Sequence, residues 1–120
     1  MATSPDPTDL IPLKHATYQV LLALADDQLH GYAIMQALTR MTGGRETILP
    51  GTLYAALARM ADEGLVEKIP APDTEASGGP KRRYYQRTPF GCDVARAESE
   101  RLRLLLDVAH SQNIVTERSK

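Results

Sequence analysis

The chain has 120 residues, a formal net charge of −1 at pH 7 and one cysteine, Cys92. A chain of this length folds as one domain with room for a helical arm, and a lone cysteine excludes an internal disulfide and fits a reducing compartment. No apolar run approaches the ~18 residues of a membrane-spanning helix, and residues 1–9 lack a signal-peptide layout, so the sequence indicates a cytoplasmic protein.

The first part of the chain predicts two amphipathic helices behind a loose tail. Residues 1–9 are polar and rich in proline, which favours disorder. Residues 13–25 and 32–41 carry apolar side chains at helical spacing. The first set is Leu13, Ala16, Val20, Leu21 and Leu24, and the second is Ile34, Met35, Leu38 and Met41. Polar, glycine-containing segments at 26–31 and 42–44 end these helices.

A third helix is predicted over residues 52–63. Thr52 has the side-chain oxygen of an N-cap, and Gly64 is a favourable stop. Leu53, Leu57 and Met60 fall at i, i+4 and i+7, so they face inward. The side chains left on the outward face are Tyr54, Ala55, Ala58, Arg59 and Asp62.

Residues 65–87 predict a β-hairpin. Residues 65–69 and 82–87 have strand character, and residues 70–80 between them contain three prolines and two glycines, as a loop does. Residues 81–87 include four basic side chains and no acid: Lys81, Arg82, Arg83 and Arg87. Such a basic stripe suits phosphate contact. Because strand side chains alternate, one of Tyr84 and Tyr85 should be buried and the other exposed.

The last helix is predicted over residues 90–110. Thr88 is a suitable N-cap and Pro89 a suitable first residue. Its apolar side chains form a stripe broader than a short three-helix domain can cover, so the helix should meet a partner. The stripe consists of Phe90, Val94, Ala97, Leu104, Leu105 and Val108, widened by Leu102, Leu106 and Ala109. Residues 113–120 should form a flexible tail.

No pattern of catalytic or metal-binding chemistry is present. His15, His30 and His110 are scattered, without acidic or cysteine neighbours at ligand spacing. Gly43-Gly44 is not followed by the lysine and hydroxyl residue of a phosphate-binding loop. We therefore expect no enzyme, no metal and no cofactor.

An ordered set of motifs resembles the PadR-like family of bacterial transcriptional regulators. The matching segments are His30-Gly31-Tyr32, Ile34, Gly51-Thr52-Leu53-Tyr54, Leu57, Glu63-Gly64-Leu65, Gly79-Pro80-Lys81-Arg82-Arg83-Tyr84-Tyr85 and Thr88-Pro89-Phe90-Gly91. The resemblance implies a homodimeric repressor whose third helix enters the major groove of DNA and whose last helix dimerises. Ala55 stands where the family often has proline, and the last helix has no tryptophan or tyrosine for stacking a ligand.

The predicted fold class is mainly α with a small β-hairpin: a winged helix-turn-helix plus a C-terminal dimerisation helix. The expected parts are a tail at 1–9, the DNA-binding domain at 10–88, the dimerisation helix at 89–112 and a tail at 113–120. The rival interpretation from another class is a winged helix used only for protein–protein contact. The outward hydroxyls and the basic stripe favour double-stranded DNA as the partner.

Eight residues are predicted to contact DNA: Thr52, Tyr54, Ala55, Ala58, Arg59, Lys81, Arg82 and Arg83. Thr52 and Tyr54 would reach phosphates, Arg59 a guanine, and the small alanines would permit close approach. The structural alternatives are an N-cap for Thr52, packing on the wing for Tyr54 and an ion pair with Asp62 or Glu63 for Arg59.

The predicted dimer contacts are Phe90, Val94, Ala97, Leu102, Leu105 and Val108. A candidate pocket for a small apolar effector lies between the last helices and the first helices. Its lining would be Leu13, His15, Tyr18, Val94, Ala97, Arg101 and Leu105. The alternative is a filled interface without an effector.

Overall fold

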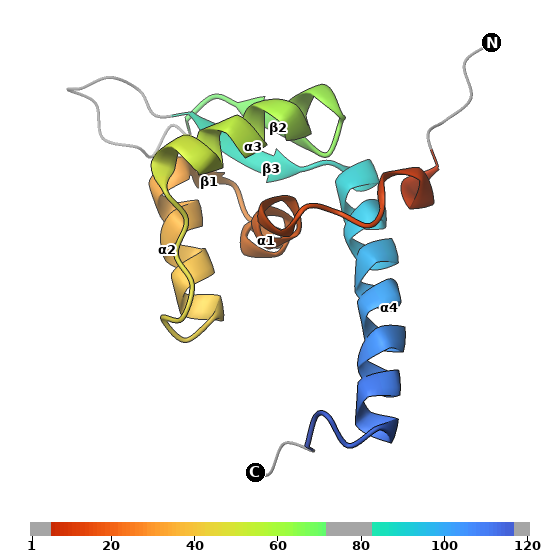
Figure 1. Cartoon of the computed structure of the whole chain (residues 1–120). Helices are drawn as coiled ribbons and strands as arrows, with labels where there is room; N and C mark the ends of the chain where they lie inside the picture. Colours follow the sequence, from red (N-terminus) through yellow and green to blue (C-terminus); the bar gives the residue numbers. More distant parts are fainter. Residues whose placement is uncertain (1–5, 72–82, 117–120) are drawn as a thin grey trace.

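The computed structural model describes residues 6–71 and 83–116. Over these residues the chain forms four α-helices, one short 3₁₀ helix and three strands (Figure 1). In chain order they are η1 (Pro7–Leu10), α1 (His15–Leu24), β1 (Leu29–His30), α2 (Gly31–Met41), α3 (Pro50–Asp62), β2 (Val66–Ile69), β3 (Tyr84–Arg87) and α4 (Pro89–Ser111). The prediction of a mainly helical fold with a small antiparallel hairpin is confirmed.

The sheet has one more strand than the sequence predicted. Its order is β1-β3-β2, and both pairings are antiparallel. Strand β2 pairs with β3 from Val66 opposite Arg87 to Ile69 opposite Tyr84, which is the predicted hairpin. Strand β1 covers two residues that the sequence analysis took for a turn, with Leu29 opposite Tyr85. Two residues are too few to show an alternating pattern, so this strand has no local sequence signal.

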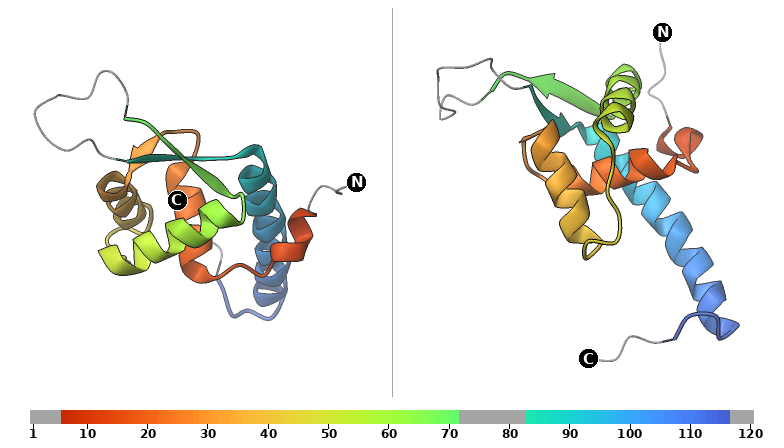
Figure 2. Two further views of the ribbon diagram at one scale, coloured as in Figure 1. Left: turned by 90° about the horizontal axis from the view of Figure 1, so that it is seen from above. Right: turned by 60° about the vertical axis from the view of Figure 1, so that its left-hand side comes forward.

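Helix α1 lies at the centre of the molecule, between α2 and α4 (Figure 1, and Figure 2, left). It contacts α2, α3, α4 and β3. Fully buried side chains from α1, α2, α3, α4 and the turn after α3 meet around it: Val20, Leu21, Leu24, Ile34, Leu53, Leu57, Met60, Leu65 and Val94. Burial of each large aliphatic side chain contributes about 1.5–3 kcal/mol, so this cluster is the main stabilising feature of the domain.

Two element boundaries differ from the sequence predictions. Helix α3 begins at Pro50 rather than at Thr52, and its N-cap Leu49 makes no side-chain capping bond. Proline suits a first helical turn because its φ is already helical and its missing N–H would have had no partner there. Residues 7–10, expected to lie in or beside a loose tail, form η1, capped by the Asp6 carboxylate, which accepts from the Thr8 N–H at 2.9 Å.

The start of α4 is fitted closely against the turn that follows α3. Thr88 is the N-cap, as predicted, and its hydroxyl accepts from the Gly91 N–H at 2.9 Å. The Thr88 N–H donates to the Leu65 carbonyl at 3.1 Å, and its hydroxyl donates to the Gly64 carbonyl at 2.5 Å. A side chain on Gly91 would overlap the Leu65 carbonyl oxygen. Glycine is therefore required at position 91.

The second half of α4 extends away from the body of the molecule (Figure 1, and Figure 2, right). Residues 103–108 are all exposed, and among them are Leu104, Leu105, Leu106 and Val108. A row of large exposed apolar side chains on a projecting helix is a surface suited to a partner.

We expect Gly91→Ala to lower the free energy of unfolding by about 1–3 kcal/mol, the usual cost of forcing an extra methyl group into a packed site. Gly51, on the open side of α3 with no atom within 4 Å of an added side chain, supplies the control. Gly51→Ala should be neutral or stabilising, because alanine is the better helix former. Urea unfolding of the two variants measures the difference, and equal stability would contradict the packing argument.

Candidate nucleic-acid interface

Helix α3 buries one face and leaves the other open. Leu53, Leu57 and Met60 are buried, as the i, i+4, i+7 pattern predicted, and Ala56 is buried beside them. The predicted outward residues Thr52, Tyr54, Ala55 and Ala58 are exposed, and Arg59 is half-buried. The helix lies at the outer surface of the molecule, beside the β2–β3 hairpin (Figure 1). The sequence analysis therefore placed the two faces of α3 correctly.

Tyr54 rests on the start of α2. Its ring covers Gly31, where any side chain would overlap the phenol, and 47% of the residue stays exposed. A surface hollow of about 290 Å³ lies here, lined by His30, Gly31, Tyr32, Tyr54 and Arg83. The structure thus brings Tyr54 and Arg83 together, and it replaces the suggested packing of Tyr54 on the wing with packing on α2. Tyr32, 61% exposed, lines the same hollow and was not among the residues predicted to contact DNA.

His30 has a structural role at this hollow. Its Nδ1 accepts from the Ala33 N–H at 3.2 Å and so caps α2, and its ring meets Tyr84 edge-on with centroids 5.3 Å apart. From the sequence, His30 was assigned no metal-binding role and was part of the His30-Gly31-Tyr32 motif, but its capping bond was not predicted. The signal that would have found this role is its position directly before the second helix.

Arg59 faces the segment that leads into α1. It lines a second hollow of about 260 Å³ together with Leu10, Pro12, Leu13, Lys14, Thr17 and Glu63. The ion pairs within residues 6–71 and 83–116 do not include Arg59, so the suggested pair with Asp62 or Glu63 is not formed. Arg59 thus lies at the edge of α3 that adjoins the segment leading into α1, without an ion pair among the described residues.

The two described residues of the predicted basic stripe, Arg83 and Arg87, have different surroundings. Arg83 is exposed, whereas Lys81 and Arg82 lie outside the described residues. Arg87 points inward: its Nη1 donates to the Leu21 carbonyl at 3.2 Å and its Nη2 pairs with Asp26 at 3.2 Å. A cation is favoured there because carbonyl groups at the end of α1 carry partial negative charge. Arg87 therefore does not belong to the surface stripe.

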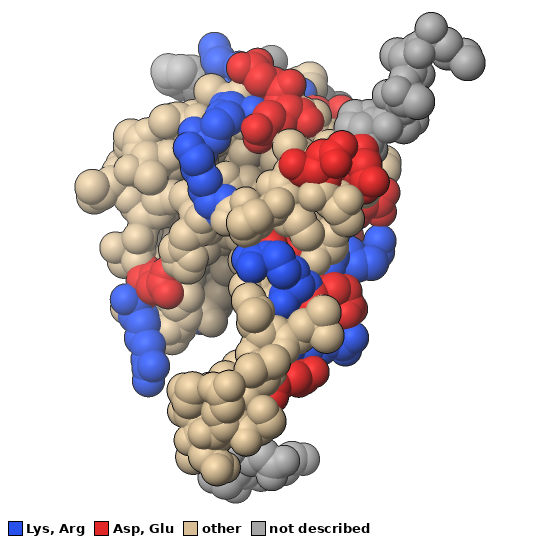
Figure 3. All heavy atoms as spheres, turned by 45° about the vertical axis from the view of Figure 1, so that its right-hand side comes forward, with Lys and Arg blue, Asp and Glu red and all other residues tan. Residues whose placement is uncertain are grey.

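The two tyrosines of β3 divide as predicted. Tyr85 is buried and Tyr84 is partly exposed. Burial raises the pKa of the Tyr85 phenol, so this hydroxyl stays neutral. Over the face shown in Figure 3, basic and acidic side chains are interspersed rather than gathered in one field.

The predicted dimer contacts fall into two groups. Val94 is fully buried in the core of this chain, so it is corrected from an interface to a core residue. Phe90 is half-buried against that core, and its role in a dimer stays a prediction. Ala97 and Leu102 are half-buried, while Leu105 and Val108 are 56% and 50% exposed. Helical spacing alone cannot distinguish a contact within the chain from a contact with a partner, which explains the error.

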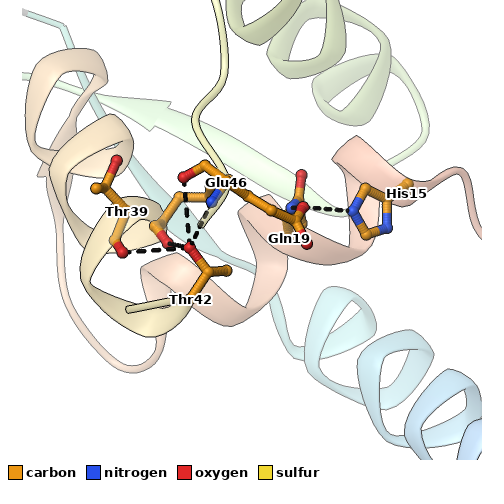
Figure 4. Close-up of polar contacts among 6 residues, drawn as sticks. His15, Gln19, Thr39, Thr42 and Glu46 are labelled. Atoms are coloured by element: carbon orange, nitrogen blue, oxygen red, sulfur yellow. Dashed lines mark hydrogen bonds and ion pairs between the residues drawn. The ribbon is translucent and has the colours of Figure 1, made fainter. Parts of the chain in front are cut away.

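The polar residues of the predicted effector pocket are already engaged within the chain. His15 Nε2 lies 2.8 Å from a Glu46 carboxylate oxygen that also accepts from Gln19 at 2.5 Å, and the Glu46 N–H donates to Thr42 (Figure 4). The hydrogen bond from His15 lowers the pKa of Glu46. Glu46, which the sequence analysis missed, thereby ties the α2–α3 loop to α1.

Two other pocket residues contact α4 or lie on it. The Tyr18 hydroxyl bonds Ser99 at 2.7 Å, and Arg101 pairs with Glu98. Val94, buried, does not line an open surface. Within the described ranges, His, Cys, Asp and Glu side chains form no group of three that could hold a metal ion, and the helices are too short or too polar to cross a membrane.

Helix α2, helix α3 with its open face and the adjoining hairpin define a winged helix-turn-helix, the architecture of a class of transcriptional regulators. The model of the transcriptional regulator PadR-like family matches residues 20–97. The chain belongs to the PadR-like family of transcriptional regulators.

Solved structures of similar fold agree with this assignment. A PadR family transcription regulator from Clostridium difficile R20291 superposes with a TM-score of 0.68 at 23% identity, covering 82% of this chain and 97% of its own. A transcriptional regulator from Clostridium thermocellum gives 0.66 at 25% identity, covering 79% and 89%. Bacillus subtilis PadR in complex with operator DNA gives 0.57 at 18% identity, covering 91% and 52%.

A curated relative is an uncharacterized 37.1 kDa protein in transposon TN4556 of Streptomyces fradiae. It is 40% identical over 80 residues, which cover 67% of this chain. The match spans 21% of that relative's length.

Proposed function

We propose that the chain is a cytoplasmic, sequence-specific DNA-binding repressor that acts as a homodimer on a near-palindromic operator. The observation that carries this proposal is the open face of α3 beside the hollow where Tyr54, Tyr32 and Arg83 meet. Hydroxyls and a guanidinium at that place suit phosphate oxygens flanking a groove. Bacillus subtilis PadR, which has a similar fold, was solved in complex with operator DNA, and this supports DNA as the partner.

Each site residue has a proposed role. Thr52, at the first turn of α3, offers a hydroxyl and backbone N–H groups to a phosphate. Ala55 and Ala58 allow close approach to base edges, and Arg59 reaches a guanine. Tyr54 and Tyr32 donate to the backbone from one side of the hollow. Arg83, with Lys81 and Arg82, supplies the charge that releases counterions.

The exposed half of α4 is the proposed dimer contact. Leu105 and Val108, with Leu104 and Leu106 beside them, would be removed from water by a second copy of the helix. Two-fold symmetry would place the two α3 helices in successive major grooves about 34 Å apart. The proposed division into a DNA-binding domain at 10–88 and a dimerisation helix at 89–112 follows from these roles.

Electrophoretic mobility shift with DNA taken from upstream of the chain's own gene tests the whole proposal. If an excess of unrelated duplex displaces the upstream DNA only weakly from the protein, the binding is sequence-specific. A folded dimer that binds no duplex better than competitor DNA would instead favour the protein–protein interaction module.

Arg83→Ala should weaken binding to the operator and to unrelated DNA alike. Loss of one phosphate contact per subunit, and so of two per dimer, makes the slope of log K against log salt less steep by about 1.8, at about 0.9 per contact. Fluorescence anisotropy at several salt concentrations measures this slope. Arg103→Ala, which removes an exposed cation paired with Glu100 on α4, is the control and should leave it unchanged. An identical slope in both variants would remove Arg83 from the interface.

Leu105→Asp should convert the dimer into monomers, because it introduces a charge where two apolar helices would meet. Leu49→Asp, the same change at a leucine 73% exposed before α3, is the control and should leave the oligomeric state unchanged. Multi-angle light scattering at micromolar concentration distinguishes the states. A monomeric unmodified chain would contradict the proposed dimer directly.

We also propose that a small apolar effector binds in the dimer between α4 and the first helices. Leu13, Tyr18, Ala97 and Leu105 remain suited to its lining, and it would release DNA by binding the DNA-free dimer more tightly. Titration of planar apolar compounds into the protein–operator complex should release DNA. If a broad panel neither binds the free protein nor displaces DNA, the dimer interface has no effector site of this kind.

A further inference from the structure

Glu98, near the middle of α4, is a buried acidic side chain, with 2% of the residue exposed. Its Oε1 accepts from Arg101 Nε at 2.7 Å. Its Oε2 accepts from Arg101 Nη2 at 2.9 Å and from the Leu13 N–H at 3.1 Å. The bonds from Arg101 hold the pKa of Glu98 below its ordinary value, and the Leu13 N–H adds to this effect. The buried charge is thus fully compensated, as such a charge must be.

The bond to Leu13 connects α4 with the start of α1. Leu13 directly precedes Lys14, the N-cap of α1. One residue after Glu98, the Ser99 hydroxyl donates to the Ala95 carbonyl at 2.7 Å, so it accepts from the Tyr18 hydroxyl of α1, 2.7 Å away. Two consecutive residues of α4 are therefore tied to α1 and to the segment that leads into it.

Beyond these residues α4 leaves the body, and residues 103–108 are all exposed. From Glu98 to the end of the helix is about 20 Å, at ~1.5 Å per residue. A tilt of about 10° at Glu98 would move the far end of the helix by about 3 Å over that length. A small change of angle at Glu98 and Ser99 is thus amplified at the far end of the projecting half.

The apolar contacts of α4 have a different effect. Val94 and Ala95 are buried and keep the first half of the helix on the core. Such contacts are non-directional, whereas hydrogen bonds to a charged group have a preferred length and angle. Loss of the Glu98 bonds would leave α4 attached but with its angle less defined.

We infer that Glu98 is a positioning residue that fixes the angle between α4 and the DNA-reading head, and thereby sets the half-site spacing that the dimer accepts. The inference rests on the proposed function, because spacing has meaning only for a dimer that binds two half-sites. According to this inference, the preference for one half-site spacing depends on a residue that lies away from the open face of α3.

Glu98→Gln tests this inference with synthetic duplexes that carry the operator half-sites at the preferred spacing or with one base pair inserted or removed. Glutamine keeps the size of the side chain but presents an amide to the guanidinium of Arg101. We expect the preference for the best spacing over the altered ones to fall about tenfold, the scale of a lost hydrogen bond to a charged group. Binding to a duplex with a single half-site should not change.

Glu100→Gln is the matched control. It removes a carboxylate from the same helix with the same i,i+3 arginine pair, at 2.7 Å from Arg103, but this pair is exposed. Its spacing preference should equal that of the unmodified chain. Tyr18→Phe, which removes only the bond to Ser99, should relax the preference in the same direction and covers the case that Glu98→Gln fails to fold.

The outcomes separate the two claims. An unmodified chain that is monomeric or indifferent to DNA sequence would overturn the proposed function and this inference with it. A folded Glu98→Gln dimer that binds the operator and keeps the full spacing preference would overturn the inference alone. An equal loss of affinity for all duplexes, the single half-site included, would show a merely structural role and overturn it as well.

Discussion

The fold depends on the burial of α1 on nearly all sides. Val20, Leu21 and Leu24 are fully buried, and α2, α3, α4 and β3 all contact this helix. The backbone at its two ends meets charged side chains from distant parts of the sequence. The carboxylate of Glu98 accepts the Leu13 N–H before its first turn, and the guanidinium of Arg87 donates to the Leu21 carbonyl in its last. An anion at the start and a cation at the end both complement the helix dipole.

Because α3 and α4 both pack on α1, this helix fixes the position of the open face of α3 relative to the exposed half of α4. Helix α3 packs on α1 through its buried face, and Glu46 binds the preceding loop to His15 and Gln19 of α1. Helix α4 is tied to the opposite flank through Glu98 and Ser99. A displacement of α1 would therefore change the position of both the proposed DNA-contacting face of α3 and the proposed dimer contact on α4.

Much of this architecture could be predicted from local patterns. Helical spacing identified the buried face of α3, and Thr88-Pro89 marked the start of α4 because a cap and a proline act within one turn. The outward placement of Thr52, Tyr54, Ala55 and Ala58 followed from the same spacing.

The remaining features depend on partners distant in sequence. Strand β1 exists because Tyr85 lies opposite Leu29, and Arg87 turns inward because the end of α1 is there. Val94 looked like an interface residue because an apolar position does not reveal which surface covers it. The buried charge of Glu98 could not be foreseen from an i,i+3 pair that Glu100 and Arg103 reproduce on the surface.

The contact between Tyr54 and Gly31 joins two motifs that are separate in the sequence. The phenol of Tyr54 occupies the space where a side chain at position 31 would stand, so the ring packs there only because residue 31 is glycine. In a variant of this sequence, a larger residue at position 31 would require a smaller or displaced side chain at position 54. The dependence runs in one direction, because Gly31 leaves room for a smaller residue at position 54 without any change of its own.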